Sequence, residues 1–530
     1  MKIRNIAAVL ILLLFHSCSK EYDKPRWDVS VIGPLVQAEI GIGNLIADSI
    51  TSIQGDGSVH ILYERSFYDF NLDSIYEVPD TIIPKVITWP FVTSTINPGF
   101  PFFSNNNNVL LGLSGVSLNE LRVRSGIIRV EMINTLPSKI IYTYTIPGAV
   151  KNGTALTFTQ TVDEAGPGGP GRFIMDIDLS GYSVNLKGST NSSFNTIYYN
   201  VQAVSDPSGT AFTVNFNDTV INIMTSIIDM EPSYARGYLG QNFIRESSSE
   251  NIGIGGLIKD GMIKLDSMNL DIFIDNYIGA DARIKFNFLE SVNSRSSASV
   301  PLNAPTMIGN VININRAIEN PVTGQAPIKS SRVFSLNNSN SNLISFIENI
   351  PDRINYEAEI EFNPLGNISS YNDFVYSDYL VEGRMKLSMP LRFAAENLML
   401  ADTQKMELGT FTDFDNAGET RLKLIVENGF PFDIELQLFV LDEQRNITDS
   451  LLGPGLVRKA NTDLNYIAVS PILSEFDVFA DSRRRDILKN GKYLGIRGRF
   501  NTPDYSQLIQ IYSHYKLKLR LTGDGIYSIR

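Results

Sequence analysis

The chain of 530 residues contains only one cysteine, three histidines and two tryptophans. A single cysteine excludes a disulfide framework and every multi-cysteine zinc or iron–sulfur site. Three histidines leave little material for a histidine-based triad or metal centre. The formal net charge of −12 argues against a nucleic acid held by phosphate contacts. We therefore expect no metal, no cofactor and no nucleic-acid partner.

The chain also lacks any apolar run of about 20 residues, the length that spans a membrane as a helix. Its first residues instead combine Lys2 and Arg4 with a short apolar run over residues 6–15, shortly before Cys18. A basic start and a short apolar core are typical of a secretory signal. With its cysteine, this segment resembles a bacterial lipoprotein signal. The resemblance implies removal of residues 1–17, acylation of Cys18 and a stable membrane anchor. A plain signal peptide with an incidental cysteine is the alternative.

Two further features concern the location of the protein. Residues 19–23, Ser-Lys-Glu-Tyr-Asp, resemble the surface-export signals of lipoproteins in the phylum Bacteroidota. Asp-(Ser/Thr)-apolar tripeptides resemble the O-glycosylation site of the same phylum, although these residue types also favour turns. The tripeptides are centred on Ser49, Ser74, Thr81, Thr219, Ser267 and Ser450. These resemblances imply a lipid-anchored outer-membrane protein on the cell surface, with the periplasmic face as the alternative.

The body of the chain predicts β-strands almost throughout. Short runs alternate apolar and polar residues and are bounded by Gly, Asn, Asp, Ser and Pro. Helical spacing is convincing only over residues 341–354 and 475–488. The asparagine run at residues 105–108 predicts an exposed loop tip where a partner could dock. Closely spaced strands with turn signals favour an all-β fold of tandem antiparallel sandwich-like units.

A strand–turn–strand motif occurs three times without a gap, centred on Asn134, Asn276 and Asn428. Each asparagine precedes an apolar residue by two positions and a proline or glycine by three. Asn can bond its own backbone and tolerates left-handed geometry, so we assign these residues to structural turns. A second strand and turn follows each motif, over residues 197–209, 354–366 and 515–525.

These repeats predict three related β units of residues 101–230, 231–385 and 386–530. An N-terminal tether and β segment over residues 18–100 would precede them. The pattern leaves open whether the units are separate sandwiches or share one continuous sheet. The first motif also resembles the Asn-Pro-type strand pair of late-embryogenesis-abundant type 2 domains, over about twenty residues per copy. That resemblance implies sandwiches of immunoglobulin or fibronectin type III shape and concerns the fold class only.

No catalytic constellation stands out. His60 and His514 lie near opposite ends of the chain, and no pair is distinguished among the 57 acidic residues. Because repeats reuse architecture more than chemistry, we expect a non-enzymatic binding or scaffolding component beside an outer-membrane barrel protein or complex. A glycan-binding lipoprotein in polysaccharide capture is the alternative. A carboxylate-based hydrolase is the third choice, and it would need two acids about 5–9.5 Å apart.

Overall fold

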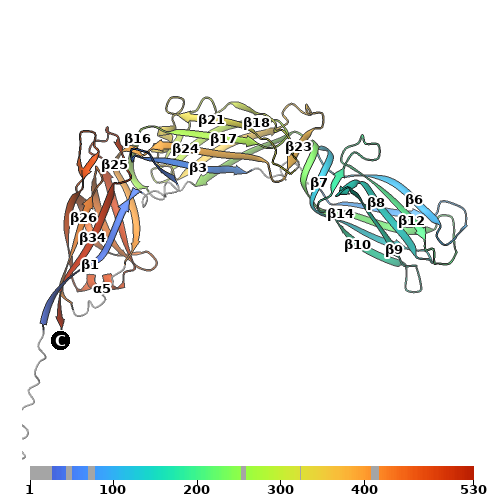
Figure 1. The fold of residues 1–530 in the computed structure, drawn as a ribbon, viewed down its shortest axis with the longest axis horizontal. Coiled ribbons are helices and arrows are strands. Elements are labelled where there is room, and N and C mark those ends of the chain that lie inside the picture. The colour runs from blue at the N-terminus through green and yellow to red at the C-terminus, as the bar shows by residue number, and fades with distance from the viewer. Residues whose placement is uncertain are drawn as a thin grey trace, which may run out of the picture. The chain divides into compact units, whose positions relative to one another are not determined.

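The computed structural model describes residues 27–42, 50–69, 78–251, 258–322, 324–406 and 417–529. Antiparallel strands dominate these residues, so the predicted all-β class with sandwich-like units is confirmed (Figure 1). The helices α4 (Leu343–Glu348) and α5 (Ser482–Asn490) are short. No helix of the described residues is long and apolar enough to cross a membrane.

Sandwich A, which contains Asn134, consists of two four-stranded sheets. The first has the order β4 (Thr81–Thr88), β14 (Thr219–Tyr238), β7 (Ser117–Asn134) and β10 (Gly171–Asp178). The second has the order β6 (Pro101–Leu110), β12 (Thr196–Ser205), β8 (Ile140–Lys151) and β9 (Thr154–Val162). The short β11 (Ser183–Asn185) pairs with both β7 and β8, and β5 (Ser94–Ile96) pairs with β13 (Phe212–Val214).

The core of sandwich A comes from alternate residues of the facing strands. Val130 on β7 and Tyr142 on β8 are both fully buried, whereas their sequence neighbours are partly exposed. Tyr144 stacks on Tyr199 and Phe158, with ring centroids 5.2 and 5.5 Å apart. A period of two with β-branched and aromatic residues therefore produces one inward and one outward face in each sheet.

Sandwich B, which contains Asn276, repeats this arrangement. Its first sheet has the order β3 (Val59–Asp69), β24 (Val381–Pro390), β17 (Asn269–Asn276) and β21 (Ser330–Asn337). Its second sheet has β15 (Asn242–Asn251), β22 (Arg353–Phe362) and β18 (Ala282–Asn293), and β18 also pairs with β19 (Ala298–Pro301) and β20 (Val311–Ile314). The short β23 (Asp373–Tyr376) pairs with β14 of sandwich A.

Sandwich C contains Asn428. One sheet has the order β1 (Trp27–Gly41), β34 (Lys516–Ile529), β26 (Ala417–Asn428) and β31 (Ile472–Ala480). The other has β16 (Ile258–Leu265), β25 (Arg392–Lys405), β32 (Tyr493–Asn501), β27 (Asp433–Leu441) and β28 (Ile447–Val457). Smaller strands of sandwich C are β29 (Asn461–Thr462), β30 (Ala468–Ser470) and β33 (Ile509–Gln510), whereas β2 (Thr51–Ile53) pairs with β3 of sandwich B.

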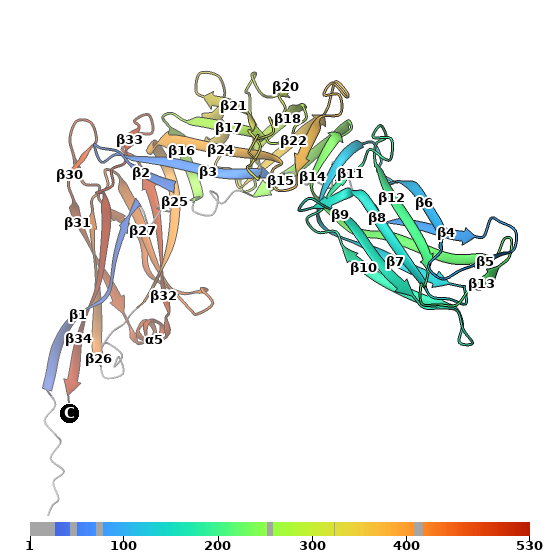
Figure 2. The same ribbon diagram turned by 45° about the vertical axis from the view of Figure 1, so that its right-hand side comes forward.

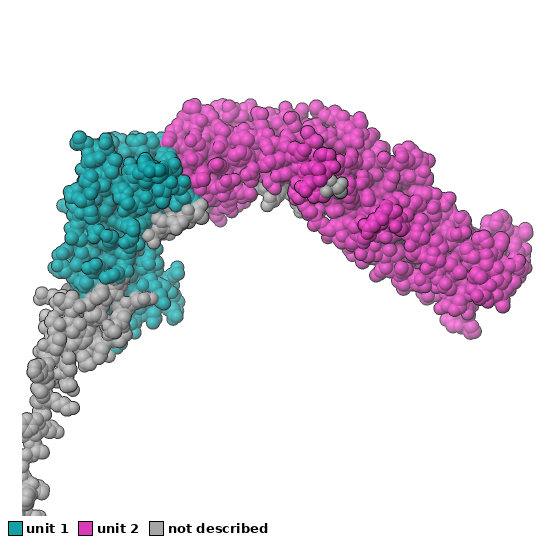
Figure 3. All heavy atoms as spheres, viewed as in Figure 1, with its two compact units in different colours: residues 1–60, 253–266, 390–530 teal, residues 61–252, 267–389 magenta. Residues whose placement is uncertain are grey.

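The short β11 joins the two layers of sandwich A into one ten-stranded sheet, which β23 also joins, whereas sandwiches B and C each have two separate sheets. Two compact units contain the described residues (Figure 3). Residues 1–60, 253–266 and 390–530 form the unit with sandwich C. Residues 61–252 and 267–389 form the unit with sandwiches A and B. Figure 2 shows the same strands from a second direction.

The chain path through the sandwiches is nested. The N-terminal strands β1, β3 and β4 join sandwiches C, B and A in that order, next to β34, β24 and β14 respectively. The chain then completes A, B and C in reverse order, except that β16 joins sandwich C early. Residues 18–100 were assigned to one segment in the sequence, but their described strands are distributed over all three sandwiches.

Other boundaries also differ from the sequence prediction. Strand β14 continues through residue 230 to Tyr238, and β24 continues through residue 385 to Pro390. Residues 475–480 belong to β31, so the helix predicted there begins only after its N-cap Asp481. Residues 105–108 are not a loop tip, because they pair with β12 in the middle of β6. Period-two alternation and turn-forming residues therefore did not locate these strand ends, the start of this helix or the strand that contains the asparagine run.

The second motif is equivalent in sandwiches A and B, where it forms β12 and β22. The third predicted copy is wrong, because Tyr515 and the residues after it lead into β34 in the other sheet. The equivalent strand of sandwich C is β32. Its Phe500 lies opposite Ile434, as Ser205 lies opposite Ile140 in sandwich A. Two strands with the same alternation can therefore occupy different sheets.

Candidate functional site

Asn134 ends β7 with its side chain fully buried. Its Nδ2 donates to the carbonyl oxygens of Ser138 (2.9 Å) and Asp163 (2.8 Å). Its Oδ1 accepts a hydrogen bond from the backbone N–H of Leu136 (3.0 Å). Ser138 and Leu136 belong to the turn between β7 and β8, whereas Asp163 follows β9 in the facing sheet. One amide therefore closes the turn and ties it to the opposite sheet, a set of contacts that we call the asparagine clamp.

The same clamp is present in the other two sandwiches. In each, the asparagine is fully buried, its Oδ1 accepts from the N–H two residues later, and its Nδ2 donates to the carbonyl four residues later. The second Nδ2 bond reaches the residue that follows β20 or β28, the strands equivalent to β9. The partners are Ile278 (2.9 Å), Ala280 (3.0 Å) and Asn315 (3.0 Å) for Asn276, and Phe430 (2.8 Å), Phe432 (3.1 Å) and Arg458 (3.0 Å) for Asn428.

Sequence reasoning missed a further shared residue at this position. An alanine lies two residues after the distant carbonyl that each clamp asparagine binds. The N–H of this alanine donates to the carbonyl oxygen of the apolar residue in the turn. These pairs are Ala165 with Leu136 (2.8 Å), Ala317 with Ile278 (2.9 Å) and Ala460 with Phe430 (2.9 Å). The alanine lies about 30 to 40 residues after the motif, at different distances, so no gap-free comparison aligns it.

The tripeptide sites differ in their accessibility. Ser49, Ser74 and the lipidation candidate Cys18 lie outside the described residues. Thr219, the first residue of β14, is exposed. The other three described sites, Thr81, Ser267 and Ser450, are half-buried. Among the described sites, only Thr219 is therefore exposed.

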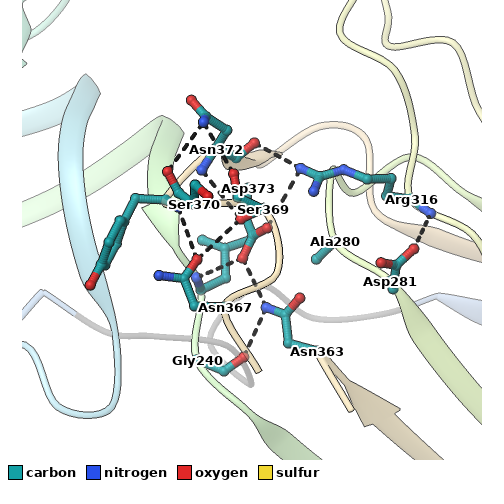
Figure 4. A network of polar contacts seen from close by, with 12 residues as sticks. Gly240, Ala280, Asp281, Arg316, Asn363, Asn367, Ser369, Ser370, Asn372 and Asp373 are labelled. Carbon is teal, nitrogen blue, oxygen red and sulfur yellow. Dashed lines mark hydrogen bonds and ion pairs between the residues drawn. The ribbon is translucent and has the colours of Figure 1, made fainter. Parts of the chain in front are cut away.

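A buried polar network surrounds Asp373, whose side chain is 1% exposed (Figure 4). Its Oδ2 accepts hydrogen bonds from the N–H of Leu239 (3.2 Å) and from Asn363 Nδ2 (2.9 Å). Asn363 Nδ2 also donates to Gly240 O (3.0 Å), and Arg316 forms an ion pair with Asp373 Oδ1 at 3.5 Å. These contacts join residues just after β14 of sandwich A to loops of sandwich B. We assign the network a structural role within this compact unit.

A second carboxylate, the half-buried Glu319, is also paired with neighbouring polar and cationic side chains. Glu319 accepts hydrogen bonds from the hydroxyls of Tyr234 (2.9 Å) and Tyr376 (3.2 Å) and forms an ion pair with Arg236. Burial raises the pKa of Glu319, but the hydrogen bonds from Tyr234 and Arg236 outweigh it and hold the pKa below its usual value. A general acid needs the opposite shift. Within the described residues, no group of three or more His, Cys, Asp or Glu side chains could hold a metal ion.

The outer face of the β4-β14-β7-β10 sheet in sandwich A carries a shallow groove of about 290 Å³. Two cross-strand rows line it. One row is Val86, Asn222, Ile133 and Arg172, and the other is Pro84, Met224, Glu131 and Ile174. Val86 is 59% exposed, Ile174 66% and Met224 39%. Each of the four strands thus contributes at least one apolar side chain to the solvent side. The charged members of the two rows are Glu131 and Arg172.

One position of this face is charged in the other two sandwiches. The residue before each clamp asparagine is Ile133 in sandwich A, Asp275 in B and Glu427 in C. Asp275 pairs with Lys329 (2.8 Å) and Arg384 (2.7 Å), and Glu427 pairs with Lys518 (3.0 Å). Because the three sandwiches share one architecture, this difference does not come from the fold. Sandwich A alone replaces the ion pairs at this position with an apolar residue.

Comparisons with known proteins add little to this geometry. No protein-family model and no curated protein matches the chain. A Parabacteroides distasonis structure described as a "putative secreted protein" is 15% identical, covers 55% of this chain and 91% of its own, and has a TM-score of 0.27. A Sulfolobus turreted icosahedral virus structure is 11% identical, covers 84% and 90%, and has a TM-score of 0.11. Scores this low carry no argument about function.

Proposed function

We propose that the chain is a non-catalytic, lipid-anchored outer-membrane protein that acts as a binding or scaffolding component beside an outer-membrane protein complex. The observation that carries the binding role is the apolar groove on sandwich A. Contiguous exposed apolar side chains with polar neighbours are typical of protein interaction sites. The occupant that fits is a protein surface with apolar side chains and a compensating charge for Arg172 or Glu131.

The chain path indicates which sandwich would lie next to such an anchor. Cys18 precedes β1 by a short segment, and β1 and the C-terminal β34 are partners in sandwich C. An acyl chain on Cys18 would therefore attach the protein next to the sandwich in which the path begins and ends. We place the protein on the cell surface, and the periplasmic face is the alternative location.

Affinity capture from detergent-solubilised outer membranes tests the proposal. The tagged wild-type chain should co-purify in stoichiometric amount with a barrel protein or another membrane component. The double variant Val86→Glu/Ile174→Glu should lose that partner, because two buried carboxylates would oppose an apolar contact. Leu464→Glu is the matched control, since Leu464 is 99% exposed and lies in sandwich C. A wild-type chain that is purified alone would contradict the proposal.

A further inference from the structure

The second sheet of sandwich A has an outer face without charge in its two central rows. The first row, across β6, β12, β8 and β9, is Asn106, Asn200, Thr145 and Thr157. Asn106 and Thr157 are exposed, and the two central residues are half-buried. All four side chains are amides or hydroxyls, which both donate and accept hydrogen bonds.

The second row has the same chemistry. It consists of Ser104, Gln202, Thr143 and Thr159 in the same strand order. Thr143 and Thr159 are hydrogen bonded at 3.0 Å, and Thr157 donates to Thr145 at 3.1 Å in the row before. These bonds hold the central hydroxyls in fixed positions, so the face is a preorganised grid.

The equivalent faces of the other two sandwiches carry charged residues at two of the compared positions. The seventh residue after the clamp asparagine is Ile141 in sandwich A, but Arg283 in B and Glu435 in C. Arg283 lies opposite Glu361, and Glu435 forms an ion pair with Arg499 at 3.4 Å.

The same contrast holds two residues further on. Thr143 and Gln202 of sandwich A correspond to Lys285 and Glu359 in B, and to Gln437 and Arg497 in C. At these compared positions, sandwich A therefore has Ile133 where its counterparts have ion pairs on one face, and it lacks their charged residues on the other.

We propose that this uncharged face of sandwich A binds a neutral polysaccharide. Each sugar hydroxyl both donates and accepts a hydrogen bond, as do the Asn, Gln and Thr side chains of the two rows. The threonine methyl groups and the neighbouring half-buried Tyr198 add apolar surface for the C–H faces of the sugar. An anionic polymer would meet no cation in these rows. The inference goes beyond protein docking and rests on a different sheet from the groove.

Native affinity electrophoresis of the full chain tests this inference. The probes are gels containing galactomannan, dextran or xylan, with polygalacturonate as the anionic counterpart. The wild type should be retarded by at least one neutral polymer and not by polygalacturonate. Thr143→Glu/Gln202→Glu should weaken the apparent affinity at least tenfold, because it places two carboxylates where the ligand offers no cation. The milder Asn106→Ala should weaken it less and leaves the strands intact.

Gln437→Glu is the control, since Gln437 is the counterpart of Thr143 in sandwich C and lies opposite Arg497. It should bind like the wild type. Retardation that is equal in the double variant, or that occurs only with polygalacturonate, overturns the inference, as does the absence of retardation by all three neutral polymers. The groove variants Val86→Glu/Ile174→Glu should keep glycan binding, so failure of the protein-docking proposal can be distinguished from failure of this one.

Discussion

The asparagine clamp of sandwich A should contribute several kcal/mol to its stability. Asn134→Ala removes the two Nδ2 bonds, to Ser138 and Asp163, and the Oδ1 bond from Leu136. A net loss of about 1 kcal/mol per buried hydrogen bond gives about 3 kcal/mol. With a urea m-value of about 2 kcal/mol per molar, the unfolding midpoint should fall by about 1.5 M. Asn134→Asp should lose at least as much at neutral pH, because it sets an oxygen against two carbonyls.

Tryptophan fluorescence can isolate this transition. Trp89 follows β4 of sandwich A and is 5% exposed, whereas Trp27 begins β1 of sandwich C. In a Trp27→Phe background, Trp89 emission therefore reports on sandwich A. Asn428→Ala makes the same chemical change in the other compact unit and should leave the Trp89 midpoint unchanged. A midpoint for Asn134→Ala within about 0.2 M of the parent would refute the reasoning.

Three further predictions follow from the fold and the anchor. Deleting residues 27–42 should lower the urea midpoint of sandwich C, because β1 is the partner of β34. Adding that segment as a separate peptide should restore the midpoint. An unchanged midpoint after the deletion would contradict the nested path. Burial raises the pKa of Asp275, but hydrogen bonds from Lys329, Ser331 and Arg384 outweigh it and the net pKa lies below its usual value. Ionised Asp275 therefore stabilises the fold above about pH 4, and this stabilisation is lost as the pH falls through the depressed pKa. In Asp275→Asn, the urea midpoint should therefore fall less between about pH 5 and 2.5 than it does in the wild type. An equal fall in both proteins would refute this. Cys18→Ala should move the protein from the membrane to the soluble fraction, and retention in the membrane would exclude the lipid anchor.

The turns of this fold could be predicted from sequence because their chemistry is local. An asparagine, an apolar residue two positions later and a proline or glycine at the third position suffice to identify Asn134, Asn276 and Asn428. Their distant acceptors, at Asp163, Asn315 and Arg458, could not be found in this way. Those contacts use backbone carbonyls, which any residue type provides.

The pairing of the strands could not be predicted, because alternation identifies a buried face but not a partner. Strand β1 pairs with β34 almost 500 residues away, and nothing in either strand specifies the other. The two faces of sandwich A were missed for a related reason. Thr143 and Gln202 are far apart in the sequence. They form one uncharged surface only because β8 and β12 are adjacent in the sheet.

Site-specific photo-crosslinking tests the central claim, the docking of a partner on sandwich A, most directly. A photoreactive amino acid at Ile174, in cells that express the protein, should give a covalent adduct with an envelope protein. The same residue at Leu464 should give none, although it is more exposed. Adducts of equal yield at the two positions, or none at Ile174, would contradict the account.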